Sequence, residues 1–487
     1  MTKRSQSRKK SGKVSATAMI INLALLALFT VLGGVVIYMT YRYNFLAFHN
    51  INVIYTGVLV AIFILSLLAI IFKKAKVLTG IVLVFFTILT GVTLFGFKSA
   101  IDVTNKFNET ASYSEVEMSV VALADSSLND ISEVTSLQAP TGADKNNIDE
   151  LMTQIRTDKG LELTPESVDS YQVAYENLKN GSSQAMVLNS AYSSLLEMNY
   201  PDYASSLKTL YTYKITKKVT SDAKQANANS FNIYISGIDT YGSISTVSRS
   251  DVNIIMTVNM NTHKILLTTT PRDSYVKIPD GGGDQYDKLT HAGIYGVETS
   301  EKTLENLYGI DIDYYARINF TSFLKLIDLV GGVEVYNDQA FTALMNKKDF
   351  PVGNITLNSE DALAFVRERY SLQGGDNDRG KNQEKVIAAL VNKLASLNSI
   401  SNFSAIINGL QDSVQTNMPL DAMMTLANTQ LSSGSKFTVT SQAVTGTGST
   451  GQLTSYAMPT ASLYMMQLDQ TSVATASQAI KNTIEGK

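Results

Sequence analysis

Three uncharged apolar runs near the N-terminus restrict what this chain can fold into. They cover Ala18–Met39, Ile51–Phe72 and Val77–Phe97 and contain 22, 22 and 21 residues. A helix needs about 20 apolar residues to cross the hydrocarbon core of a bilayer. A cleaved signal peptide has an apolar stretch of only about 7–15 residues, so cleavage cannot account for three longer runs. The sequence therefore predicts three transmembrane helices rather than buried helices of a soluble domain.

The charges are segregated along the chain. Residues 1–98 hold eleven Lys and Arg and no Asp or Glu, whereas all 43 acidic residues follow with the other 29 basic ones. Because basic loops stay in the cytoplasm, the arm at 1–17 and the Lys73–Lys76 turn are expected there. The chain is then a multi-pass membrane protein, and its three spans place all residues after Lys98 outside the cell. The arm could also be a nucleic-acid patch, but it is too short for specific DNA readout. Contact with anionic lipid is the simpler interpretation.

Composition narrows the chemistry that the chain can perform. It has no cysteine and only three histidines among 487 residues. These counts exclude a disulfide framework, a thiolate zinc site and a cysteine nucleophile, and they argue against a multi-histidine metal centre. Changes in pattern divide the chain into a basic arm (1–17), three membrane spans (18–98), a small α/β accessory region (101–219), a polar linker (220–230), a larger α/β domain (231–397) and a C-terminal extension of that domain (398–487).

Strand and helix patterns alternate from Phe231 onward. Strand patterns cover 231–237, 251–258, 264–270, 314–320, 333–336 and 366–370, and helical patterns cover 300–307, 321–330, 359–365 and 379–397. In the accessory region, residues 192–210 have a helical pattern with a break at Pro201. This alternation predicts an α/β fold with a central sheet covered by helices.

Charged side chains gather where these strands end. The first strand leads to Asp239, and Arg249 and Asp251 share one face of the next strand because strand side chains alternate. Arg367 and Arg369 would likewise share a face of the strand expected at 366–370. In open α/β sheets, ligands bind outside the strand ends. This edge of the sheet is expected to gather Arg249, Arg272, Arg367, Arg369 and Arg379, with Gln383 one helical turn after Arg379.

Five neighbouring guanidinium groups repel one another unless an anion lies between them. Arginine recognises phosphate through two hydrogen bonds at once, and several arginines together suit a pyrophosphate. Asp239 and Asp251 provide hard oxygen ligands of the kind that Mg²⁺ (or Mn²⁺) takes together with substrate phosphates. Arginines beside a divalent cation are typical of phosphoryl transfer, in which positioning and charge stabilisation supply most of the catalysis.

Each of these residues also has a plainer interpretation. Any one arginine could form an ordinary surface salt bridge, and such pairs contribute little to stability. Lys288 is a further candidate for a phosphate contact, whereas His291 fits a capping or packing residue better than a catalyst. The acidic loop at 376–378 could supply a general base, but turn formation explains its Gly-Asp-Asn-Asp sequence equally well.

At these positions the sequence resembles the LytR-CpsA-Psr family, and most closely its streptococcal capsule-assembly branch. The matching stretches, within residues 231–397, are FNIYISGIDTYG, SRSDVNIIMTVN, ILLTTTPRDSYV, DKLTHAGIYG, FTSFLKLIDLVGGVEVYN, AFVRERY and DRGKNQEKVI. The three-span N-terminus, the accessory region and the tail are similar to that branch as well. The resemblance implies metal ligands at Asp239 and Asp251, pyrophosphate-binding arginines at the five positions above with Gln383 beside them, and an apolar channel for a polyprenyl tail.

The resemblance further implies a membrane-anchored, extracellular, Mg²⁺-dependent phosphotransferase. It would join undecaprenyl-pyrophosphate-linked capsular polysaccharide to peptidoglycan, with Arg272, Arg367, Arg369 and Asp251 as catalytic residues. Its partners would be the lipid-linked polymer, peptidoglycan, the membrane and other capsule-assembly proteins, with no specific nucleic acid. Two alternatives remain open: a sensor or regulator of capsule production that binds polyprenyl phosphate, and a polyprenyl pyrophosphatase that uses water as acceptor.

Overall fold

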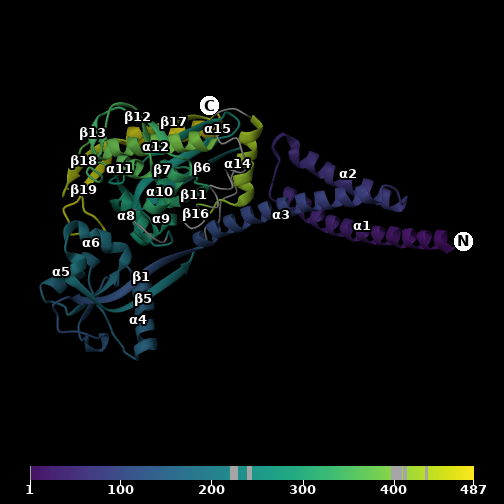
Figure 1. Ribbon diagram of the computed structural model, residues 1–487. Coiled ribbons are helices and arrows are strands. Elements are labelled where there is room, and N and C mark those ends of the chain that lie inside the picture. The colour runs from purple at the N-terminus through teal and green to yellow at the C-terminus, as the bar shows by residue number, and fades with distance from the viewer. Residues whose placement is uncertain (1, 220–228, 239–243, 396–408, 410–413, 434–436) are drawn as a thin grey trace. The chain divides into compact units, whose positions relative to one another are not determined.

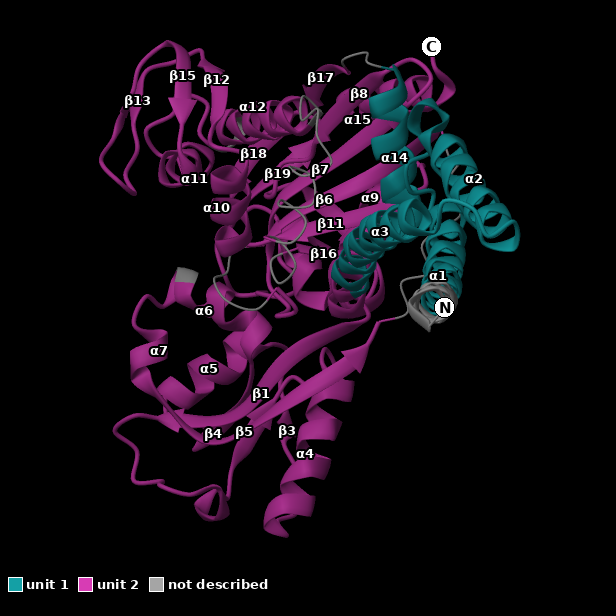
Figure 2. Ribbon diagram, turned by 45° about the vertical axis from the view of Figure 1, so that its right-hand side comes forward, with its two compact units in different colours: residues 1–105, 419–435 teal, residues 106–418, 436–487 magenta. Residues whose placement is uncertain are grey.

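A computed structural model describes residues 2–219, 229–238, 244–395, 409, 414–433 and 437–487 (Figure 1). The chain divides into two compact units, residues 1–105 with 419–435 and residues 106–418 with 436–487 (Figure 2). Its two largest sheets belong to the second unit, one in the accessory region and one in the larger α/β domain, and the described residues also form four two-stranded sheets.

The first unit is built on three long helices, α1 (Thr2–Arg42), α2 (Ile51–Ile71) and α3 (Lys76–Ala111). Segments 17–42, 48–71 and 76–111 are long and apolar enough to cross a membrane, in agreement with the three predicted helices. A cluster of large apolar side chains packs the helices together, and it contains Leu26, Phe29, Leu59, Ile70 and Leu83.

A helix from the C-terminal region completes this first unit. α14 (Leu420–Ser433) contributes Leu420 to a cluster with Val36, Phe45 and Phe97. Asn428 on α14 donates to the carbonyl oxygen of Asn44 at 2.6 Å and accepts from the backbone N–H of Phe48 at 3.3 Å. The short connection between α1 and α2 is therefore bonded to a segment almost 400 residues later in the chain.

The accessory region forms a five-stranded sheet in the order β3-β2-β4-β1-β5. Its elements are β1 (Tyr113–Leu123), β2 (Leu137–Ala139), α4 (Lys145–Lys159), β3 (Glu166–Ser167), α5 (Tyr171–Lys179), β4 (Ala185–Asn189), α6 (Ser193–Asn199), α7 (Tyr203–Ser206) and β5 (Leu207–Lys218). The helix predicted over 192–210 is wrong in its last part. From Leu207 the chain is rich in Thr, Tyr and Ile, which favour strands, and it pairs with β1 over the whole length of β5.

The larger domain has a six-stranded sheet in the order β16-β11-β6-β7-β8-β17. The strands are β6 (Ser230–Ile238), β7 (Ser250–Asn259), β8 (Lys264–Thr269), β11 (Tyr314–Ile318), β16 (Val414–Thr416) and β17 (Thr438–Ala443). β6, β7 and β8 are antiparallel, whereas β11 is parallel to β6 and β17 is parallel to β8. Residues after 397 thus supply both edge strands of this sheet.

Helices cover both faces of the sheet, which confirms the predicted α/β fold. Side chains alternate along each strand, so Tyr234 and Ile235 of β6 point to opposite faces. Tyr234 packs in a core with residues of α9 (Val297–Tyr308) and α15 (Gln470–Glu485). Ile235 lines a cavity with residues of α10 (Phe320–Leu329), α11 (Ser359–Arg367) and α12 (Asp376–Ala395).

The remaining elements of this domain are short. They are β9 (Tyr275–Ile278), β10 (Gln285–Lys288), α8 (Leu289–Ala292), β12 (Val333–Asn337), β13 (Phe341–Thr342), β14 (Asp349–Phe350), β15 (Gly353–Leu357), β18 (Gly446–Thr450) and β19 (Tyr464–Leu468). The strand predicted at 314–320 ends at Ile318, because the side chain of Asn319 accepts a hydrogen bond from the backbone N–H of Ser322 and caps α10.

The strand predicted at 366–370 does not form. α11 continues to Arg367, and Glu368 ends the helix in an extended conformation (φ −63°, ψ 135°). The carboxylate of Glu368 accepts hydrogen bonds from the backbone N–H groups of Leu344 (2.6 Å), Arg369 (2.9 Å) and Ser371 (3.0 Å). Although burial opposes ionisation of Glu368, these bonds lower its pKa below the usual range. The backbone after Arg367 is therefore bonded to a side chain instead of a neighbouring strand.

Candidate active site

The arginines predicted from the strand ends lie around one cavity at the edge of the central sheet. Arg249 immediately precedes β7, Arg272 follows β8, Arg367 is the last residue of α11, and Arg379 lies in the first turn of α12. Arg369 and Gln383 line the same cavity. We refer to Arg249, Arg272, Arg367, Arg369 and Arg379 as the arginine cluster.

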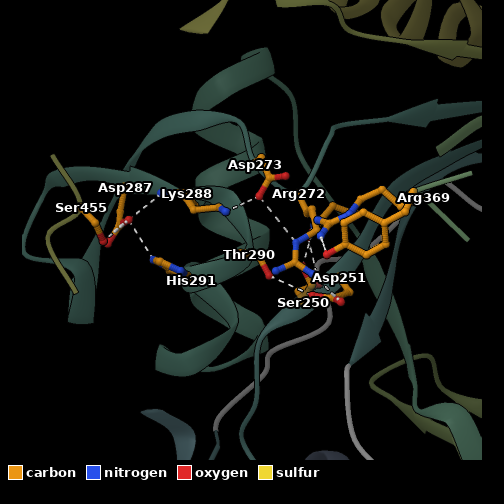
Figure 3. A network of polar contacts seen from close by, with 12 residues as sticks. Ser250, Asp251, Arg272, Asp273, Asp287, Lys288, Thr290, His291, Arg369 and Ser455 are labelled. Carbon is orange, nitrogen blue, oxygen red and sulfur yellow. Dashed lines mark hydrogen bonds and ion pairs between the residues drawn. The ribbon is translucent and has the colours of Figure 1, made fainter. Parts of the chain in front are cut away.

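Asp251 is a carboxylate that lines the same cavity, and it lies beside Arg272 and Thr290 (Figure 3). Its Oδ2 accepts a hydrogen bond from Nη1 of Arg272 at 2.6 Å, and its Oδ1 accepts one from Oγ1 of Thr290 at 3.2 Å. Burial opposes ionisation of Asp251, but the positive charges of Arg272, Arg249 and Arg379 outweigh it and lower the pKa below the usual range. Asp251 is therefore a carboxylate at neutral pH.

Two members of the cluster stack on aromatic rings. The guanidinium carbon of Arg367 lies 4.2 Å from the ring centroid of Phe320, and that of Arg369 lies 4.5 Å from the ring of Tyr370. Arg369 also donates to the hydroxyl of Tyr370. Stacking fixes the plane of a guanidinium without using its N–H groups. Although no strand forms at 366–370, Arg367 and Arg369 both line the cavity, because the end of α11 and the turn after it bring them there.

The cavity has a volume of about 530 Å³, which is within the range of about 300–1,000 Å³ typical of ligand pockets. Its lining has a polar part, formed by the charged side chains of the arginine cluster and Asp251 together with the amide of Gln383, and an apolar part. The apolar part comes from the sheet and from α10, α11 and α12, and it includes Ile235, Ile238, Val252, Ile318, Phe320, Phe323, Leu363, Val366, Ile387 and Leu390. Such a lining complements a ligand that has both an anionic group and a hydrocarbon chain.

Lys288 does not line this cavity, so the phosphate contact expected for it is not what the structure shows. Its buried ammonium group pairs with Asp273. Oδ1 of Asp273 also lies 3.7 Å from Nε of Arg272. Lys288 is the last residue of β10 and directly precedes α8. In Figure 3 its side chain points to the carboxylate of Asp273, and Arg272 approaches that carboxylate from the right.

His291 and Asp378 have structural surroundings. Residues 376–378, which were expected to form a loop, are the start of α12. His291 is buried, and its Nδ1 lies 2.8 Å from Oδ1 of Asp287, which agrees with a packing residue. Asp378 accepts hydrogen bonds from the backbone N–H of Gly374 at 2.7 Å and from the side chain of Gln339 at 2.8 Å. These bonds support turn formation as the role of Asp378.

Asp251 fits a divalent cation as one hard oxygen ligand, because an ionised carboxylate has lone pairs beyond the two hydrogen bonds it accepts here. Asp239, the second expected ligand, lies outside the described residues. Within the part of the chain that the structure describes, no group of three or more His, Cys, Asp or Glu side chains could hold a metal. This donor set fits Mg²⁺, which usually takes one or two carboxylates and completes its shell with phosphate oxygens and water.

Sequence reasoning missed three polar residues of this region: Thr290, Asp273 and Tyr370. Asp273 directly follows Arg272, and Thr290 lies two residues after Lys288, so both adjoin residues that had been singled out. Tyr370 is 76% exposed and lines the cavity beside Arg369. Its position next to the Arg-Glu-Arg sequence was a signal, but nothing in the spacing indicated that its ring lies under a guanidinium.

The fold and the site together define an α/β protein with three long apolar helices and an arginine-lined, partly apolar cavity. A family model described as the LytR_cpsA_psr family matches residues 198–472, and the chain belongs to this family. The match contains all of the described site residues. A second family model, described as DNA polymerase processivity factor, matches residues 73–188. That stretch includes α3 and the first part of the accessory region.

Several proteins of known type are similar to this chain. The polyisoprenyl-teichoic acid–peptidoglycan teichoic acid transferase TagU of Enterococcus faecalis is 35% identical over 292 residues, which cover 59% of this chain and 90% of the relative. The protein of the same name from Oceanobacillus iheyensis is 32% identical over 271 residues, covering 54% and 78%. The crystal structure of B. subtilis TagU is 28% identical with a TM-score of 0.41, covering 53% of this chain and 98% of that one.

Proposed function

We propose that this protein transfers a glycopolymer from a polyprenyl-pyrophosphate lipid to peptidoglycan, and that the polymer is a capsular polysaccharide. The observation that carries the proposal is the cavity in which the arginine cluster meets an apolar lining. A polyprenyl pyrophosphate has a doubly charged phosphate group next to a long hydrocarbon chain, so it complements both parts. The relatives named as teichoic acid transferases support the transfer reaction. The capsular donor rests on the resemblance of the N-terminal spans and accessory region to the capsule branch.

In the proposed reaction, the arginine cluster binds the pyrophosphate and an acceptor hydroxyl attacks the phosphorus next to the sugar. The bond from that phosphorus to the bridging oxygen breaks, the hydroxyl loses its proton to solution, and undecaprenyl phosphate leaves. Guanidinium groups stabilise the negative charge that builds on the bridging oxygen as it leaves, and such charge stabilisation is the main source of catalysis in phosphoryl transfer. The pyrophosphate is already an activated group, so the reaction needs no ATP.

Mg²⁺ (or Mn²⁺) is part of the proposal, with Asp251 and Asp239 as the residues that would hold it. A bound cation would supply further positive charge to the phosphates. Asp251 is suited to this role because the positive charges of Arg272, Arg249 and Arg379 favour its ionised form although its side chain is only 19% exposed. The ion pair between Asp251 and Arg272 supports this role, because it holds the carboxylate of Asp251 beside the proposed pyrophosphate site.

The location of the reaction follows from the charge pattern of the N-terminal region. We propose that residues 1–17 lie in the cytoplasm and that residues 99–487 lie outside the cell, as the distribution of Lys and Arg predicts. This orientation puts the cavity on the side of the membrane where the lipid-linked donor and the peptidoglycan acceptor meet. Other capsule-assembly proteins are further candidate partners there.

Reconstitution of the full chain with polyprenyl-pyrophosphate-linked polysaccharide and peptidoglycan tests the proposal. We expect polymer on the peptidoglycan and released polyprenyl phosphate. Release of polymer phosphate into water without transfer would indicate a pyrophosphatase, and binding without turnover would indicate a sensor or regulator. Capsular and teichoic acid donors compared in the same assay test the donor, and faster turnover of the teichoic acid donor would contradict the capsular part of the proposal.

A further inference from the structure

A chain of charges runs from the cavity into the protein interior (Figure 3). Asp251, Arg272, Asp273 and Lys288 follow one another with alternating sign. Arg272 donates to Asp251 at 2.6 Å, its Nε lies 3.7 Å from Oδ1 of Asp273, and that same oxygen pairs with the ammonium of Lys288. Arg272, Asp273 and Lys288 are only 8%, 2% and 3% exposed. Arg272 therefore lies between two carboxylates, one of which lines the cavity and one of which does not.

Asp273 competes with Asp251 and with a bound anion for the guanidinium of Arg272. Asp273 is ionised, because the charges of Lys288 and Arg272 outweigh the effect of burial and lower its pKa below the usual range. An unneutralised buried carboxylate attracts the nearest guanidinium strongly, since charges in a protein interior are poorly screened. The ammonium of Lys288 pairs with the same oxygen of Asp273 that faces Arg272, and so neutralises the carboxylate. It thereby leaves the guanidinium bonded to Asp251 and facing the cavity.

The backbone around Lys288 is fixed by hydrogen bonds of its own. Its N–H donates to Oδ1 of Asp287 at 2.7 Å, and Asp287 also accepts from Ser455 Oγ and from the N–H of Ala457, each at 2.8 Å. Two residues after Lys288, the N–H of Thr290 donates to the carbonyl oxygen of Arg272 at 2.9 Å. The loop that contains Ser455, the start of α8 and the backbone of Arg272 are thus held together, so the ammonium of Lys288 has a defined position.

We infer that Lys288 is a positioning residue, which neutralises Asp273 and so keeps the guanidinium of Arg272 directed at the pyrophosphate. The inference rests on the proposed function for the nature of the ligand. It differs from a direct phosphate contact by Lys288, because the lysine acts through Asp273 and Arg272. Removing the lysine alone should therefore weaken pyrophosphate binding, whereas removing the charge of Asp273 at the same time should restore it.

The test compares the wild-type full chain in detergent with Lys288→Met, Asp273→Asn and the double variant. Binding of inorganic pyrophosphate is measured by calorimetry, turnover of the lipid-linked donor gives kcat and KM, and thermal melting reports folding. We expect Lys288→Met to weaken pyrophosphate binding at least tenfold and the double variant to recover to within about threefold of wild type. Lys302→Met is the matched control, because Lys302 pairs with Asp280 at 2.8 Å in an exposed Lys–Asp pair elsewhere. Pyrophosphate binding by the Lys302→Met variant should equal that of wild type.

Three results would overturn the inference. Unchanged pyrophosphate binding by a folded Lys288→Met variant would show that Asp273 does not compete for Arg272. A double variant that melts like wild type but binds as weakly as Lys288→Met would show that the lysine contacts the anion itself. Losses of binding that follow the melting temperature across all variants would indicate a purely structural pair. By contrast, a wild-type protein that binds pyrophosphate but transfers nothing would contradict the proposed function and leave the positioning role intact.

Discussion

Arg272, Arg367 and Arg369 are the side chains on which the proposed chemistry depends most. If these arginines stabilise the charge of the transition state, replacing any one of them by Ala should lower kcat by about 10²-fold or more. Arg→Lys should restore only part of the rate, because lysine lacks the two-pronged geometry of the guanidinium. Turnover and thermal melting of each variant provide the measurement. Retained turnover in all three Ala variants, or losses that unfolding fully explains, would reject the cluster as the catalytic centre.

Glu384 follows Gln383 on α12, and burial raises its pKa to about 7. Because the folded protein favours the protonated form, this contribution to stability is present below the ordinary pKa and is lost as the pH rises through about 7. Glu384→Gln should therefore be more stable than wild type at pH 8, by up to about 3 kcal/mol, with little difference near pH 4. Melting at both pH values measures the effect. An equal difference at the two pH values would contradict it.

At the scale of elements, the apolar lining of the cavity belongs to α10, α11 and α12. Ile387→Trp should fill part of this lining and lower kcat/KM at least tenfold for a long polyprenyl donor, with a much smaller effect on a short prenyl donor. The matched control is Asn392→Trp, which adds the same ring on the exposed side of α12. Initial rates with donors of two chain lengths give the comparison. An equal loss for both lengths would place the prenyl chain elsewhere.

The elements also show which parts of the site can be predicted from sequence. Arg249 and Asp251 were expected at one site and both line the cavity, although Arg249 lies just before β7 and a register shift at Asp251 interrupts the strict alternation. The strand expected at 366–370 failed because Glu368 is bonded to the N–H of Leu344, 24 residues earlier, and no local pattern records that contact. The apolar lining could not be predicted either, because its residues come from separate elements between Ile235 and Leu390. Lys288 was expected to contact phosphate, but the direction of its side chain depends on how β10 passes into α8.

At the scale of the whole molecule, the orientation in the membrane can be measured directly. We expect residues 1–13 inside and Lys487 outside, because the Lys and Arg of the N-terminal region favour the cytoplasm. Protease added to intact protoplasts should remove an epitope placed after Lys487 and should spare one placed before Thr2. Protection of the C-terminal epitope in intact protoplasts, with digestion after lysis, would contradict the proposed topology. It would place the candidate active site in the cytoplasm, away from the peptidoglycan acceptor.

A structure of the full chain bound to a polyprenyl pyrophosphate would show directly whether the arginine cluster binds the pyrophosphate and the apolar lining binds the prenyl chain. The account predicts density for the two phosphates among the arginines, within hydrogen-bond distance of Arg272, and density for the prenyl chain along Phe320, Phe323 and Leu390. Lipid bound elsewhere with this cavity empty would contradict the account. So would a prenyl chain that runs away from these apolar residues while the phosphates lie outside the arginine cluster.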